Sequence, residues 1–94
     1  MMIVSGWIVV DPEARPAYLE GSAEMAKAGR KAPGCLDLAI TAGLADDSRV
    51  NIFERWPSEL GLMAFRHSGP EFSQFDAVKE MNVCRYEASP EGPA

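Results

Sequence analysis

Few side chains in this 94-residue chain are suited to acid–base or metal chemistry. There is one histidine, His67, and the two cysteines, Cys35 and Cys84, belong to no CxxC or histidine-containing pattern. A histidine titrates near pH ~6.5, so His67 is the natural candidate for a general base, although its position also suits a solvent-exposed helix cap. The sequence therefore predicts no metal site built on histidine or cysteine. A carboxylate-only site remains open but has no spacing signal, and free, buried cysteine thiols are favoured over a disulfide.

Asn51 is a second polar candidate, because its amide both donates and accepts hydrogen bonds. It could orient a carbonyl or phenolate, or it could satisfy backbone groups at the end of a hairpin. Several aromatic side chains could hold a flat ring, and the same spacings also suit plain core packing. These candidate substrate-binding residues are Trp7, Tyr18, Phe53, Trp56, Phe65 and Phe72.

Other chemistry is less well supported. Arg55, Arg66 and Arg85 could bind an acidic substrate, but surface ion pairing is the commoner use of such residues. No serine has a recognisable histidine and carboxylate partner, which disfavours hydrolysis.

The charge balance argues against a polyanionic partner. Lys and Arg number 9 against 14 Asp and Glu, giving a net charge of −5, and phosphate binding depends on clustered basic residues. No stretch approaches the roughly 18–20 apolar residues of a membrane span. The first six residues lack the basic region and cleavage site of a secretion signal. We therefore expect a cytoplasmic protein that binds neither nucleic acid nor membrane.

The elements that must position these side chains follow from hydrophobic periodicity. Strands are predicted at residues 3–10, 35–42, 50–56 and 81–88, with helices at 15–31 and 58–66 and a further short helix at 71–79. The order βαββαβ is that of α+β, ferredoxin-like domains, in which two helices cover one face of a four-stranded antiparallel sheet. We expect one domain over residues 1–88 and a flexible C-terminal tail at 89–94.

The second face of this sheet poses a problem. The first strand has large apolar residues on both faces, with Trp7 and Val9 alternating with Ile8 and Val10, and their exposure would leave a large apolar patch. A twofold copy of the chain would cover that patch, so we expect a homodimer. Trp7 then faces either a ligand pocket or the dimer interface. The alternatives are distorted edge strands or a cover made by residues 71–81.

The segments PGCLDL at 33–38 and VNIFERW at 50–56, the latter followed by a helix with Ser and Glu at its start, resemble the antibiotic biosynthesis monooxygenase family of dimeric α+β barrels. The resemblance extends over about residues 3–87. It implies subunits whose sheets pack face to face, with a pocket in each between sheet and helices. Some members oxygenate aromatic polyketides, turning a phenol or hydroquinone into a quinone with O₂ and no metal or flavin. Similar folds also host quinol oxidation, haem degradation and polyketide cyclisation.

The resemblance also assigns residues. Asn51 and Trp56 are the counterparts of an Asn and a Trp in the third strand of the family's oxygenases. Because they are five positions apart, they fall on opposite faces of a regular strand unless a bulge intervenes. The family commonly shows a histidine nine residues after that Trp; here the position is Phe65, and His67 lies two residues later.

The resulting hypothesis is a cofactor-independent monooxygenase-like enzyme that oxidises a polycyclic aromatic, phenolic or quinol molecule with O₂ as co-substrate. His67 or Asn51 would handle the proton, and the aromatic residues would hold the ring. Haem is a minor alternative, with His67 as iron ligand. Two other functions remain open: a non-oxidative cyclase or isomerase of the same fold, and a non-catalytic dimeric small-molecule-binding protein.

Overall fold

The computed structural model describes residues 1–68 and 75–94. The elements are β1 (Met2–Val9), α1 (Arg15–Lys31), β2 (Asp37–Ala42), β3 (Arg49–Trp56), α2 (Glu59–Ser68), the 3-10 helix η1 (Phe75–Ala77) and β4 (Glu80–Glu87). The predicted βαββαβ order is confirmed, with element ends shifted by one or two residues. The first four residues of the helix predicted at 71–79 lie outside the described residues; in the described part, 75–79, the structure has a single 3-10 turn at Phe75–Ala77.

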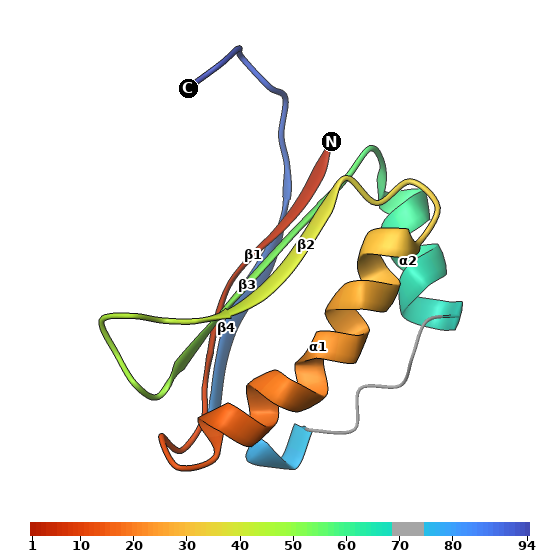
Figure 1. The fold of residues 1–94 in the computed structure, drawn as a ribbon. Coiled ribbons are helices and arrows are strands. Elements are labelled where there is room, and N and C mark those ends of the chain that lie inside the picture. Colours follow the sequence, from red (N-terminus) through yellow and green to blue (C-terminus); the bar gives the residue numbers. More distant parts are fainter. Residues whose placement is uncertain (69–74) are drawn as a thin grey trace.

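The four strands form one antiparallel sheet in the order β2-β3-β1-β4. Both helices lie on the same side of this sheet, as Figure 1 shows. The pairing of β1 with β3 runs through eight consecutive residue pairs, from Met2 opposite Trp56 to Val9 opposite Arg49. No bulge interrupts β3, so its side chains alternate strictly between the two faces.

The core lies between the sheet and the helices. Trp56 is completely buried, and its ring packs on that of Phe65 with 5.6 Å between the ring centroids. Two adjoining groups of apolar side chains fill this layer. Their buried members are Met2, Val4, Leu38, Trp56, Leu62 and Phe65 in one group, and Ile8, Val10, Tyr18 and Val50 in the other.

Helix α1 is fastened to the sheet at both ends. Near its start, Nη1 of Arg15 donates to the backbone oxygens of Gly43 and Asp46, at 2.9 Å each, and to that of Arg49 at 3.2 Å. Near its end, Nε of Arg30 donates to the backbone oxygen of Leu38 at 2.8 Å. These bonds hold the β2–β3 hairpin against the helix and fix where β3 begins.

The second face of the sheet, which we call the open face, is uncovered by any described residue (Figure 1). The described part of the segment that might have covered it packs elsewhere, because Ala77 and Val78 contact the core group that contains Ile8 and Tyr18. The expectation of buried thiols is wrong for Cys84, which is exposed on the edge strand β4, whereas Cys35 is half-buried. In the part of the chain that the structure describes, no helix is long and apolar enough to cross a membrane.

Candidate functional site

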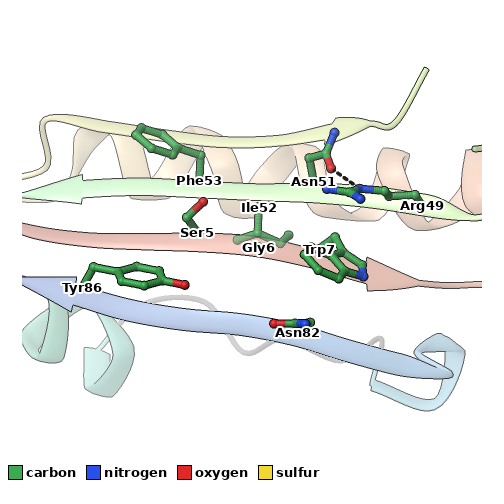
Figure 2. A pocket seen from close by; sticks show the side chains of 9 residues that line it. All are labelled: Ser5, Gly6, Trp7, Arg49, Asn51, Ile52, Phe53, Asn82 and Tyr86. Carbon is green, nitrogen blue, oxygen red and sulfur yellow. Dashed lines mark hydrogen bonds between the residues drawn. The ribbon is translucent and has the colours of Figure 1, made fainter. Parts of the chain in front are cut away.

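A pocket of about 420 Å³ lies on the open face, across β1, β3 and β4. Its described lining is Ser5–Trp7 from β1, Arg49 and Asn51–Phe53 from β3, and Asn82 and Tyr86 from β4. Figure 2 shows these side chains across the three strands, with helix α1 behind the sheet. The pocket expected from the family resemblance was between sheet and helices, so the pocket described in this chain is on the opposite face.

The strand register places a tryptophan between two asparagines. Trp7 lies directly opposite Asn51 on one side and Asn82 on the other, and side chains directly opposite one another in antiparallel strands are ~4.5–5.5 Å apart at Cβ. Gly6 permits this arrangement. With a φ of +153°, a Cβ built on it would be 1.9 Å from the backbone oxygen of Asn82, so β4 could not approach β1 so closely beside any other residue.

Arg49 links the ring and the amide. Its guanidinium carbon lies 4.5 Å from the centroid of the Trp7 ring, and its Nε donates to Oδ1 of Asn51 at 2.7 Å. Such a cation over an indole face is attracted by the ring quadrupole, by ~0.5–1 kcal/mol at an accessible site. Arg49 is not among the site residues predicted from the sequence, although its spacing of two from Asn51 on a strand places both on one face.

The described pocket lining contains one basic group and no aspartate, glutamate, histidine or cysteine. The remaining polar groups are the hydroxyls of Ser5 and Tyr86 and the amides of Asn51 and Asn82. This arrangement can stack a flat ring and donate hydrogen bonds to an electron-rich oxygen. It provides no side chain suited to take up a proton near neutral pH.

Three of the predicted site residues meet at this pocket, namely Trp7, Asn51 and Phe53. The prediction that Asn51 and Trp56 lie on opposite faces of the third strand is confirmed, because Asn51 lines the pocket and Trp56 belongs to the core under the helices. The structure thus separates the two residues that the resemblance paired.

The other predicted site residues do not reach the pocket. Tyr18 and Phe65 are core residues, 4% and 9% exposed, and burial raises the pKa of the Tyr18 hydroxyl to about 12. His67 is exposed near the end of α2, on the side of the sheet away from the pocket. Phe72 lies outside the described residues. The roles predicted for these side chains stay predictions.

A family model described as antibiotic biosynthesis monooxygenase matches residues 1–78. No curated protein matches the chain. Among solved structures, a protein from Nitrosomonas europaea with the provisional name antibiotic biosynthesis monooxygenase is 14% identical, with a TM-score of 0.81 over 94% of this chain and 98% of that one. A provisionally named member from Deinococcus radiodurans is 19% identical, with a TM-score of 0.73 over 100% and 98% of the two chains.

The haem degrader MhuD from Mycobacterium tuberculosis, solved with two haems in its active site, is 17% identical to this chain. Its TM-score is 0.70 over 99% of this chain and 100% of that one. At these identities the structural likeness concerns the fold. It supports the ferredoxin-like α+β arrangement described above.

Proposed function

We propose that this chain, which belongs to the antibiotic biosynthesis monooxygenase family, oxidises a phenolic, quinol or polycyclic aromatic molecule with O₂ and without a cofactor. We place the substrate in the pocket on the open face. The observation that supports this most directly is the contact set of Arg49, whose guanidinium lies over the Trp7 ring while its Nε binds Asn51. A ring, a positive charge and an amide thus meet in one place.

The pocket chemistry suits a substrate that enters or becomes an anion. In cofactor-free oxygenation of a phenol, one atom of O₂ replaces a ring hydrogen as the second quinone oxygen and the other leaves as water, with all electrons supplied by the phenol. The phenolate is the electron-rich form that passes an electron to O₂. A nearby cation favours that ionised form, so Arg49 would promote loss of the phenol proton to water and hold the resulting oxyanion.

We also propose that the chain acts as a homodimer joined through the open face. Ile3 and Val9 lie on that face outside the pocket lining and are only half-buried in the single chain, and a second copy would remove their surface from water. A partner would also exclude solvent from the pocket, which strengthens its electrostatic interactions.

Oxygen uptake tests the proposed oxidation. The purified protein is supplied with a phenol or with anthrone, with and without a chelator. We expect uptake that the chelator does not abolish. Asn51→Ala should slow it by roughly tenfold or more, since removal of a single oxyanion-hole donor costs ~10²-fold or more where the donor is fully used. The matched control is Thr41→Ala, because Thr41 is directly opposite Asn51 on β2 and does not line the pocket.

One observation favours a second candidate, a non-catalytic small-molecule-binding protein. The described pocket lining contains no side chain that titrates near neutral pH, and a cyclase or isomerase would need such a base. Tight binding of the same aromatic compounds, without oxygen uptake or conversion, would establish the binder and refute the oxygenase.

The described residues do not fit a haem site at the position where the family commonly has its histidine. That position is Phe65, which is buried against Trp56 and offers no ligand atom for iron. His67 is exposed two residues further along. A Soret band on titration with haem that is lost in His67→Ala would contradict this assessment.

A further inference from the structure

The hairpin between β2 and β3, residues 43–48, holds a leucine entirely in solvent. Leu44 is 101% exposed, and among the described residues no other large apolar side chain is as exposed. Its neighbour Gly43 is buried. Single exposed apolar residues are common on protein surfaces and by themselves identify no partner. Leu44 differs from them in the way the hairpin is built and in the direction in which it points.

The hairpin is held in one shape by hydrogen bonds on both of its sides. The backbone N–H of Gly43 donates to the backbone oxygen of Arg49 at 2.9 Å. The guanidinium of Arg15 donates to the backbone oxygens of Gly43 and Asp46, at 2.9 Å each. Ser48 donates to Oδ1 of Asp46 through its backbone N–H at 2.9 Å and its hydroxyl at 2.7 Å. A hairpin fixed in this way has little freedom to lose when its tip is buried against a partner, which favours affinity.

The hairpin projects on the side of the open face. Figure 1 shows the connection between β2 and β3 extending from the sheet in the direction away from both helices. The open face on that side has half-buried apolar residues outside the pocket lining, namely Ile3 and Val9. A second copy that packs on the open face therefore meets the hairpin, and Leu44 with it, at the edge of the contact.

We infer that the β2–β3 hairpin is an arm that packs against the second copy of the chain, with Leu44 of each copy buried on the other. The inference rests on the homodimer proposed above and adds to it the contact that the hairpin makes. An isologous interface repeats every contact. Two leucine side chains are therefore removed from water at once, which favours association.

Sedimentation velocity at a series of concentrations measures the dissociation constant of the dimer for the full chain and its variants. Leu44→Glu should weaken self-association at least about tenfold, because a charge replaces a buried leucine at two symmetric positions. Leu44→Met should retain most of the affinity, since methionine has a similar apolar volume.

The matched control is Leu60→Glu. It makes the same charge change on α2, where the side chain is 80% exposed on the helix side of the sheet, and should leave the dissociation constant unchanged. Equal unfolding transitions of Leu44→Glu and wild type, measured at a concentration where both are monomeric, exclude a folding defect.

The outcomes separate the arm from the dimer. If Ile3→Glu weakens self-association and Leu44→Glu does not, the inference is overturned and the dimer through the open face stands. Equal weakening by Leu44→Glu and Leu60→Glu also overturns the inference, because net charge then explains both. Weakening by Leu44→Glu but not by Ile3→Glu overturns packing on the open face and the inference with it. A wild type that stays monomeric at high concentration overturns the dimer and the arm together.

Discussion

The indole N–H of Trp56 donates to Oε1 of Glu54 across 3.1 Å, and neither side chain reaches solvent to any extent, at 0% and 4% exposed. The second carboxylate oxygen of Glu54 accepts from Nη2 of Arg66 at 2.9 Å. Every polar side-chain atom of Glu54 and Trp56 therefore takes part in a hydrogen bond, as low-dielectric surroundings require. This pair holds the end of β3 beneath α2.

We predict that Glu54→Leu lowers the free energy of unfolding by about 2–3 kcal/mol, because it leaves the Trp56 N–H unpaired in the core. Glu54→Gln should cost less, about 1–2 kcal/mol, since its oxygen can still accept from the indole and only the charge pairing is lost. Urea unfolding followed by tryptophan fluorescence measures both. Glu59→Gln is the control, because both side chains of the Glu59–Arg85 ion pair are half-exposed. This substitution should change the free energy of unfolding by less than ~0.5 kcal/mol. A fully stable Glu54→Leu would show that the buried pair is not stabilising.

Two helical glycines should respond oppositely to alanine. At Gly61 in α2, an added Cβ would meet Trp56 at an ordinary 3.4 Å, so Gly61→Ala should stabilise by about 0.5–1 kcal/mol through helix propensity. At Gly29 in α1, the Cβ would be 2.3 Å from Cδ1 of the buried Leu38. Overpacking at this position should cost about 1–3 kcal/mol of stability, which outweighs the gain in helix propensity. The melting temperatures of the two variants show whether each substitution stabilises or destabilises the protein. A stabilising Gly29→Ala would refute the close helix–sheet contact.

Stability should fall at high pH because of Tyr18. Burial raises its pKa from 10.0 to about 12, so between these pH values the unfolded tyrosine has lost its proton while the folded one retains it. Stability from this group is complete below pH 10 and is lost as pH rises towards 12, by ~1.4 kcal/mol per unit and up to about 2–3 kcal/mol. Tyr18→Phe should remove this component. The difference between wild type and variant in urea unfolding across that range measures it, and parallel curves would contradict the prediction.

The proposed dimer predicts that a charge introduced on the open face weakens self-association, whereas the same charge on the helix face does not. Ile3 is half-buried on the open face, opposite Arg55 and Tyr86 and outside the pocket lining. Ile3→Glu should weaken self-association at least about tenfold, because two charges would enter an apolar twofold contact. Leu60→Glu makes the same change on α2, where the side chain is already 80% exposed, and should have no effect. Sedimentation velocity distinguishes the species. A monomeric wild type at high concentration would refute the dimer.

The amino-acid sequence by itself determined the order of elements and the alternation along each strand. Apolar periodicity of two and of three to four residues is local, so it predicts strands and helices without knowledge of their partners. The same alternation placed Asn51 and Trp56 on opposite faces before any pairing was known. That result needed only a strand without a bulge, which the continuous register of β3 confirms.

The tertiary structure decided which residues share a site. Both faces of β1 are apolar, so the sequence could not show that Ile8 points to the helices and Trp7 away from them. The contact of Arg49 with Trp7 arises because β1 pairs with β3 in one particular register. Register is a non-local property, set by packing of the whole sheet against the helices, and a slip of one residue would reverse every side chain. Local patterns therefore predicted the elements, whereas the pocket depended on how they pair.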